Sequence, residues 1–319
     1  MFAIIGIVVV FGAVLGGYLM EKGNILVLLQ PSELVIIAGA AMGTILISNR
    51  PHILKGMVKG IRGVFGESEF STKHYLDSLK MLYDVFSRAR RDGLVAVEAD
   101  IEHPEKSKLF SVYPAIAKNE EVIAFICDTL RTAASTVVDP FDLDQMMELD
   151  MDVRHHDATQ PVSSLSTMAD SLPGIGIVAA VLGVVITMGA LGGPPEEIGH
   201  KVAAALVGTF LGILLCYGLV GPLASSMAKT ADEERAYYYV LRVCIASFVK
   251  GVPPIMAIEM ARRAIPGHVR PAFLLVETTC RSKTAPGAAK AAPGAAPAPA
   301  AAAVPPPAAA PAPPPAAAA

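Results

Sequence analysis

Two prolines in long uncharged stretches are the first residues of this sequence whose type and spacing suggest a function. Pro173 lies near the start of the apolar run 171–195, and Pro222 lies near the end of the run 202–227. A proline interior to a helix removes one backbone hydrogen bond and weakens the helix locally. Two such weak points at one membrane depth would suit a gated ion path.

Both prolines also have an ordinary structural explanation. Pro173 would cost nothing in the first turn of a helix that Ser171 caps. Pro222, beside Gly218 and Gly221, would mark a kink near a helix end. The spacing of the prolines leaves both readings open.

Catalysis has no support in the sequence. It contains no H-E-x-x-H, G-x-S-x-G, Walker A or dinucleotide-binding motif. The four cysteines lack C-x-x-C spacing, and we expect free thiols. The adjacent pair His155 and His156 would point about 100° apart on a helix, which makes a poor metal site. We therefore predict no enzyme activity, no cofactor and no metal.

Ion transport would need help from another chain. Neither apolar run contains Asp, Glu, Lys, Arg or His, although a proton relay through hydrocarbon needs a titratable group. The runs offer only weak hydrogen bonders such as Thr187, Thr209 and Tyr217. If an ion crosses here, the carboxylate that carries it must come from another polypeptide.

Composition places these runs in a membrane protein. The chain is 53% hydrophobic, with a mean hydropathy of +0.51, which is too apolar for an ordinary soluble domain. Its net charge of −3 makes nucleic acid an unsuitable partner. We predict an all-α membrane protein with four transmembrane helices and a helical cytoplasmic domain between helices two and three.

Hydropathy, charge and helical periodicity set the predicted boundaries. Pro31, Ser32 and Glu33 read as a helix start, with Ser32 as the cap and Glu33 in the first turn. The expected transmembrane helices are 1–20, 34–49, 171–192 and 202–227; the expected outer links are 21–33 and 193–201; a cytoplasmic helical domain covers 50–170, further cytoplasmic helices cover 228–283, and a disordered Ala/Pro-rich tail covers 284–319.

Basic residues predict the orientation. They crowd the end of the second apolar run, as in Arg50, Lys55 and Lys59, whereas the short links carry only Lys22 and Lys201. Positive charge marks the cytoplasmic side, so both termini and residues 50–170 should be cytoplasmic. The first apolar run has no basic residue before it, which favours a retained helix over a cleaved signal peptide.

Three separated motifs resemble one known family. They are SRARRDGLVAVEADIEHP at residues 87–104, DSLPGIGIVAAVLGVV at 170–185 and LVGTFLGILLCYGLVGPLA at 206–224. Over residues 1–280 the chain is similar to the MotA/PomA family, the four-helix subunits of the bacterial flagellar stator. The Ala/Pro-rich tail lies outside the resemblance.

The resemblance implies a function. Members of this family sit in the bacterial inner membrane and form a homo-oligomeric ring around two copies of a single-span partner, MotB or PomB, whose aspartate carries the ion. Ion passage then turns the ring, and the cytoplasmic domain pushes the rotor protein FliG. The partners implied here are therefore a MotB-type protein, FliG, further copies of the chain and membrane lipid.

The resemblance also assigns roles by motif position. Pro173 and Pro222 match the prolines that couple ion flow to motion, and Arg90 and Glu98 match the charged pair that engages FliG. Without that match, a solvated helix face is the better explanation of Arg90 and Glu98. Asp170 would either collect the ion on exit or cap helix three.

The coupling ion is predicted from one position. Ala180 stands where sodium-driven relatives of the family carry a threonine, whose oxygen could help to coordinate a dehydrated cation. Alanine cannot do so, and Thr209 would instead hydrogen-bond the protonated aspartate of the partner. We therefore expect proton coupling, with Ala180, Thr209 and Asp170 along the ion path.

Two other functions compete with a stator subunit. An ExbB- or TolQ-like subunit, which energises the outer membrane, is the nearest alternative, but those proteins have three spans. A membrane scaffold that moves no ion is the alternative from a different class. Four predicted spans and the segment with Arg90 and Glu98 favour the stator.

Overall fold

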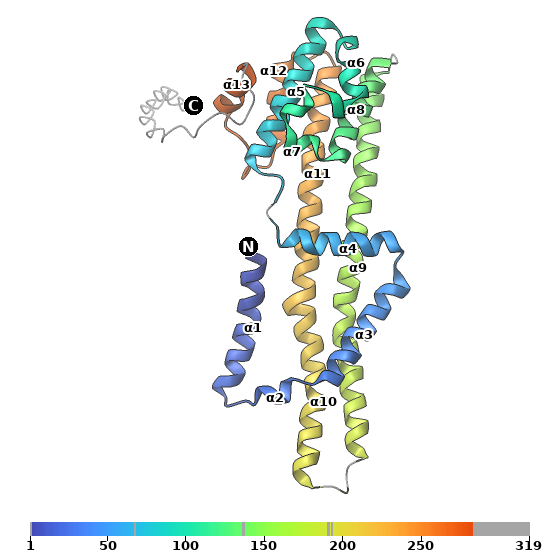
Figure 1. The fold of residues 1–319 in the computed structure, drawn as a ribbon, viewed down its shortest axis with the longest axis vertical. Helices are drawn as coiled ribbons and strands as arrows, with labels where there is room; N and C mark the ends of the chain where they lie inside the picture. The colour runs from blue at the N-terminus through green and yellow to red at the C-terminus, as the bar shows by residue number, and fades with distance from the viewer. Residues whose placement is uncertain (1, 67, 136–137, 190–191, 193, 283–319) are drawn as a thin grey trace, which may run out of the picture.

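Two long antiparallel helical columns organise the chain in the computed structural model, which describes residues 2–66, 68–135, 138–189, 192 and 194–282 (Figure 1). One column is the single helix α9 (Pro140–Met188). The other consists of α10 (Pro195–Leu215), the π-helical turn η3 (Cys216–Val220) and α11 (Gly221–Val249). The described residues contain helices and no β-strand.

The four predicted transmembrane helices are confirmed as helices that are long and apolar enough to cross a membrane. The first two belong to α1 (Phe2–Met20) and to the pair α2 (Ile25–Leu28) and α3 (Pro31–Ser48). Among its described residues α1 has none that is buried, whereas α3 packs against α9 and α10. A large part of the apolar surface is therefore left without contacts within this chain.

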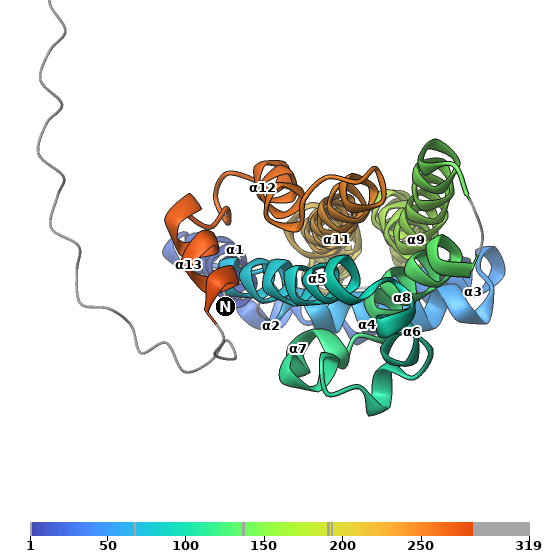
Figure 2. The same cartoon turned by 90° about the horizontal axis from the view of Figure 1, so that it is seen from above.

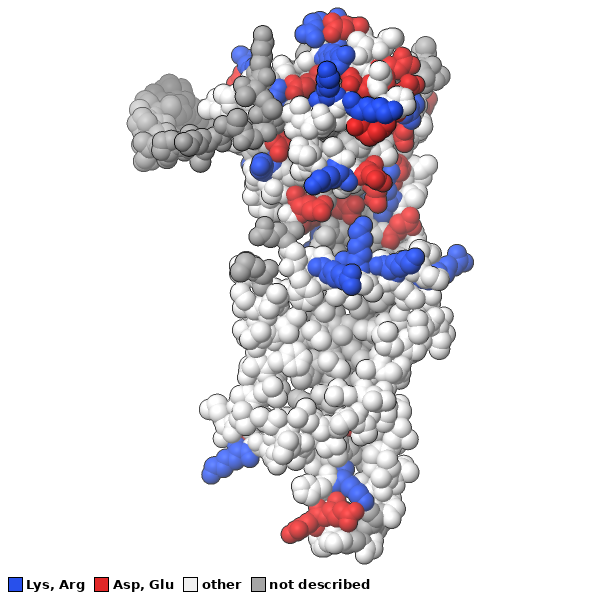
Figure 3. Space-filling model, in the orientation of Figure 1, with Lys and Arg blue, Asp and Glu red and all other residues white. Residues whose placement is uncertain are grey.

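A short amphipathic helix separates the apolar part from the polar part. This helix, α4 (Pro51–Val64), crosses both columns at a steep angle (Figure 1). Met57 on its inner face is buried, while Lys55, Lys59 and Arg62 are exposed. These side chains contribute to the blue belt at the boundary in Figure 3. Such a helix is suited to lie in the plane of a membrane surface.

The polar end of the columns carries a helical domain. It contains α5 (Thr72–Asp92), α6 (Val95–Glu102), α7 (Pro114–Ala117), α8 (Glu120–Ser135), α12 (Pro254–Ala264) and α13 (Phe273–Arg281), with the 3₁₀ turns η1 (Pro104–Lys106) and η2 (Phe110–Val112). Figure 2 shows these helices grouped around the ends of α9 and α11, and α12 packs against both α5 and α11.

An aromatic core holds this domain together. Tyr237 of α11 is fully buried, and its hydroxyl lies 2.7 Å from Ser78 Oγ of α5. Nearby, the rings of Phe86 and Phe248 stack at 4.2 Å between centroids. Aromatic pairs of this kind add about 0.5–1.5 kcal/mol beyond their buried area. The core joins α5 to α11, so the domain is built directly onto the second column.

Two helices continue past predicted segment boundaries, and one predicted helix cap is wrong. Helix α9 runs without interruption through residues 170 and 171, where a domain boundary was expected, and α11 continues past residue 227 to Val249. At the start of α3, Gln30 holds the cap position and Pro31 opens the helix, so Ser32 is not the cap, although Glu33 does lie in the first turn. The predicted tail 284–319 lies outside the described residues.

Candidate functional site

Small residues bring the two columns into backbone contact within the apolar part. We call this contact the glycine seam; it comprises Gly176, Ala179 and Gly183 of α9 with Ala205, Gly208 and Gly212 of α10. A methyl group added to Gly212 would lie 2.6 Å from the Leu172 carbonyl oxygen, and one on Gly176 would lie 2.8 Å from the Gly208 carbonyl oxygen. Only glycine permits so close an approach.

Small residues recur four apart in α1, α3, α9 and α10, but those of α9 and α10 pack differently from the glycines of α1 and α3. The pairs Ala179/Gly183 and Gly208/Gly212 both contribute to the glycine seam. By contrast, nothing lies within 4 Å of a methyl group placed on Gly12, Gly16, Gly39 or Gly43. These four glycines of α1 and α3 therefore make no close contact with other described residues of this chain.

The residues predicted along the ion path lie on faces that other helices of the chain leave uncovered. On α9, Pro173 and Ala180 follow the same helical stripe as Ile177, which is 55% exposed. On α10, Thr209 shares a stripe with Leu206 and Ile213 at spacings of three and four, and Leu206 is 66% exposed. These apolar faces are open to a further helix.

Ala180 and Thr209 lie at the same height on the two columns. A methyl group on Gly208 would be 3.1 Å from the Ala180 backbone nitrogen, and Thr209 is the next residue of α10. Both side chains are half-buried. The structure therefore brings Ala180, the position from which the coupling ion is predicted, close to Thr209 across the glycine seam.

Pro173 interrupts the hydrogen bonding of α9 in the middle of the helix. It lies within the 49 residues of α9, as does Pro161, so the reading of Pro173 as a first-turn proline is wrong. Ser171 is not a cap either, because its hydroxyl donates to the Met168 carbonyl oxygen at 2.7 Å. Without an amide hydrogen, Pro173 leaves one carbonyl of the preceding turn without its helical partner.

Pro222 follows a local widening of the second column. It occupies the first turn of α11, directly after the π-helical turn η3, where the Gly221 amide bonds to the Cys216 carbonyl oxygen five residues earlier. Single π-helical turns within α-helices occur frequently at functional sites. A kink near a helix end was expected at Pro222. The structure instead has a π-helical turn before Pro222, and the column continues through it.

The two prolines do not lie at one depth. Leu172, next to Pro173, contacts Gly212 across the glycine seam, whereas Pro222 lies on the far side of η3. The column rises by about 15 Å between residues 212 and 222. Pro222 is thus closer to the polar domain than Pro173.

Asp170 lies one helical turn from Pro173 toward the polar domain. It is exposed, and because α9 continues through it, the alternative that it caps helix three is wrong. The other alternative, a carboxylate at the mouth of the ion path, is compatible with this exposure.

Arg90 and Glu98 lie on the surface of the polar domain. Arg90, in the last turn of α5, is exposed, and one guanidinium nitrogen donates to the Gly251 carbonyl oxygen at 3.3 Å. Glu98, in the first turn of α6, is exposed too. Neither takes part in an ion pair with another described residue, whereas their neighbour Arg88 is bound to Asp100 at 2.7 Å. Both charges are therefore available to a partner.

A cavity of about 600 Å³ opens beside Arg90. Apart from Arg90 its described lining is almost entirely apolar, with Leu94, Val138 and Phe248 contributed by three different segments. A protein surface that approached Arg90 would also meet this hollow.

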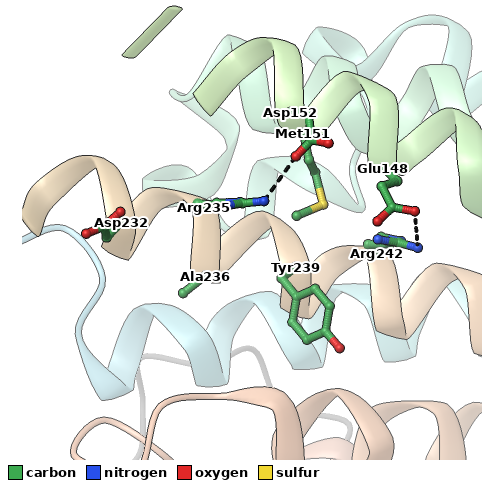
Figure 4. A pocket seen from close by; sticks show the side chains of 8 residues that line it. All are labelled: Glu148, Met151, Asp152, Asp232, Arg235, Ala236, Tyr239 and Arg242. Carbon is green, nitrogen blue, oxygen red and sulfur yellow. Dashed lines mark hydrogen bonds and ion pairs between the residues drawn. The ribbon is translucent and has the colours of Figure 1, made fainter. Parts of the chain in front are cut away.

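Charged side chains brace the two columns within the polar domain. Arg235 of α11 pairs with Asp152 of α9 at 3.0 Å, and Arg242 pairs with Glu148 at 3.3 Å; Figure 4 shows these contacts around a cavity of about 340 Å³. Arg242 also bonds to Asp144 at 2.7 Å, and this hydrogen bond lowers the pKa of the Asp144 carboxyl. The cavity is therefore part of the bracing between the columns.

Sequence reasoning missed one buried acid. Glu33 of α3 is 5% exposed, and its side chain packs against the glycine seam. Its position after Pro31 at the start of an apolar helix suggested only a favourable charge near a helix N-terminus. The described residues contain no group of three or more His, Cys, Asp and Glu side chains that could hold a metal ion.

Comparison with known families defines the class of protein. Residues 117–238, which include both prolines and the glycine seam, match the MotA/TolQ/ExbB proton channel family. Residues 4–93 match the family of the motility protein A N-terminal region. With four helices able to span a membrane, the chain is a multi-pass membrane protein of this proton-channel class.

Individual relatives narrow the class to one family. The chain is 37% identical to motility protein A of Escherichia coli K12 over 90% of its own length and 97% of that protein. It is 34% identical to chemotaxis protein LafT of Vibrio parahaemolyticus, over 86% of its length and 96% of the relative. The chain belongs to the motility protein A family.

Solved structures share the fold. A chain from the structure of C. jejuni MotAB superposes with a TM-score of 0.70 at 19% identity, covering 85% of this chain and 98% of that one. A chain from the flagellar MotAB stator complex of Bacillus subtilis gives a TM-score of 0.67 at 21% identity, covering 83% and 96%. The two-column architecture is thus the family fold.

Proposed function

We propose that this chain is the multi-span subunit of a flagellar stator, which forms a proton channel with a single-span MotB-type protein and converts proton flow into torque on FliG. The observation that carries the proposal is the similarity to motility protein A over nearly the whole chain. The proposed role is mechanical and conductive rather than enzymatic. We place the chain in the bacterial inner membrane with both termini in the cytoplasm. The reason is that the belt of basic side chains on α4 in Figure 3 lies on the side of the apolar part that carries the polar domain.

The uncovered helix faces support partners within the membrane. The stripe Pro173, Ile177 and Ala180 of α9 and the stripe Leu206, Thr209 and Ile213 of α10 consist of uncharged residues. A single membrane helix with one aspartate would complete an ion path there, because Thr209 can hydrogen-bond a protonated carboxyl group. The unpacked glycines of α1 and α3, Gly12, Gly16, Gly39 and Gly43, suit contacts with lipid or with neighbouring copies in a ring.

Proton coupling is tested with the whole complex. With Ala180 in place of a hydroxyl residue, we expect rotation speed to depend on the proton gradient and to stay unchanged when sodium is replaced by potassium at fixed pH. The measurement is the rotation of tethered cells that carry this chain and its MotB-type partner. Loss of rotation in potassium would overturn proton coupling, and failure to co-purify with a single-span partner would overturn the stator role itself.

The rotor contact is proposed at the exposed charges of the polar domain. Arg90 and Glu98 have no ion-pair partner among the described residues, so both can pair with charges on FliG. Pairs of this kind at an interface govern partner choice and association rate.

Charge reversal tests this contact. Replacing Arg90→Glu together with Glu98→Lys should reduce swimming speed sharply while the amount of complex in the membrane stays unchanged. Reversed charges on FliG should restore swimming. The matched control is Glu102→Lys, which reverses another exposed acid at the end of α6 and should leave swimming intact. Swimming of the double variant at normal speed would exclude these residues as the rotor contact.

An ExbB- or TolQ-like role fits less well. That role is compatible with the match of residues 117–238, but not with the match of residues 4–93 to the motility protein A N-terminal family. A scaffold that moves no ion would not need prolines within its membrane columns, so variants of Pro173 also separate the stator from a scaffold.

A further inference from the structure

Glu33 is a buried acid without a partner in the apolar part of the molecule. The residue is 5% exposed, and its Oε2 atom has no hydrogen-bond partner among the described residues. Leaving an ionised carboxylate unpaired in such surroundings would cost many kcal/mol, so the group is stable there only with a proton bound.

The surroundings of this acid consist of small residues from both columns. A methyl group on Gly208 would lie 2.6 Å from Glu33 Oε2 and 3.1 Å from Ala179 Cβ, and one on Gly183 would lie 3.6 Å from Glu33 Oε1. The glycines thus leave room for the carboxyl group. Because Gly208 also adjoins the Ala180 nitrogen, Glu33 lies at the height of Ala180 and Thr209.

The charged groups on the helices that pack against α3 lie too far along those helices to pair with the Glu33 carboxyl group. On α10 the titratable residues are Glu196, Glu197, His200 and Lys201, all near the start of the helix, and Lys201 is bound to Glu197 at 2.9 Å. On α9 the titratable residue nearest in sequence to the glycine seam is Asp170, and α2 contains no titratable residue. Nor does the carboxyl group bond to an amide at the start of its own helix, where an acid usually acts as a cap.

We propose that Glu33 is a proton-binding site in the outer half of the membrane, which loads a proton from the outer side and passes it toward the carboxylate of the single-span partner. This inference rests on the proposed stator function. It adds a second protonatable group to an ion path whose two apolar runs, 171–195 and 202–227, contain none.

The chemistry is the transfer of one proton. In loading, a hydronium ion gives its proton to the Glu33 carboxylate, which leaves water and a neutral carboxyl group. In release, the O–H bond of Glu33 breaks and the proton moves, through water, to the next carboxylate. Glu33 then returns to its ionised form, which attracts the next proton.

The bound proton is tested by chemical labelling. Dicyclohexylcarbodiimide adds to protonated carboxyl groups in apolar surroundings, so treatment of the intact complex at neutral pH should label Glu33, as read by peptide mass spectrometry. Labelling should decrease as the pH is raised and be absent in Glu33→Gln. Glu196, which is exposed at the start of α10, is the internal control and should stay unlabelled. An unlabelled Glu33 overturns the proposal.

The transfer is tested by rotation and proton flux. Glu33→Gln keeps the size and polarity of the side chain but cannot release a proton, so we expect both to fall by at least about tenfold with assembly unchanged. Glu33→Asp should retain part of the activity, and the exposed neighbour Ser32→Ala should retain all of it. If Glu33→Gln rotates like the wild type, the proton is merely structural and the proposal is wrong. If the wild-type complex itself conducts no protons, the stator function fails instead.

Discussion

Replacing Gly212 by valine should prevent the two columns from packing and should remove most of the assembled complex from the membrane. A side chain at residue 212 would meet the Leu172 carbonyl oxygen at 2.6 Å and Gly176 Cα at 2.9 Å. Both are backbone atoms and cannot turn aside, so the helices must separate. Overpacking of this kind costs about 1–3 kcal/mol even where side chains can adjust.

The amount of complex measures this effect. We expect the yield of Gly212→Val that co-purifies with its single-span partner to fall by at least about tenfold, which corresponds to about 1.4 kcal/mol. Gly199→Val is the matched control on the same helix, because nothing lies within 4 Å of a methyl group there. Normal yield and normal thermal stability of Gly212→Val would show that the glycine seam is not a close contact.

Replacing Pro173 by alanine should abolish rotation while leaving the complex assembled. Alanine restores the amide hydrogen that proline lacks, so α9 gains a backbone hydrogen bond in its membrane part. A proline in a helix interior costs about 3 kcal/mol, and its removal should therefore stiffen the column without destabilising it. Rotation that depends on bending at this point would stop.

Two measurements, of assembly and of torque, are needed to interpret the Pro173→Ala variant. Fluorescently tagged complexes should still gather at the motor, and bead rotation should lose nearly all torque. Pro161→Ala is the control, since Pro161 also lies within α9 but faces Gly56 of α4, outside the glycine seam. Full torque from Pro173→Ala would show that the proline has no role in coupling. That result would favour the alternative that the chain is a membrane scaffold that moves no ion.

Much of the fold was predictable because hydropathy and helical periodicity are local properties. Four apolar stretches of bilayer length gave four helices, and the helical periodicity of residues 50–170 predicted a helical domain, to which α5, α6, α7 and α8 belong. The helices continue past the segment boundaries expected near residues 170 and 227 for a physical reason. Composition changes at the edge of a bilayer, but nothing there requires the backbone to leave the helical conformation.

The site was only partly predictable. Pro173, Ala180 and Thr209 could be named from the sequence and a family resemblance, and the structure shows Ala180 and Thr209 at one height. Glu33 could not be recognised, because its burial depends on glycines about 150 residues or more along the chain. The π-helical turn before Pro222 escaped prediction as well, since a proline after two glycines also fits an ordinary kink.

The unbroken length of α9 would let it act as a lever if the helix bends at Pro173. From Pro140 to Pro173 the helix extends for about 50 Å. A tilt of about 5° at Pro173 would therefore move the far end by about 4 Å, somewhat less than the rise of one helical turn. The aromatic core and the Arg235 and Arg242 ion pairs tie the polar domain to both columns, so Arg90 and Glu98 would be carried along by that stroke.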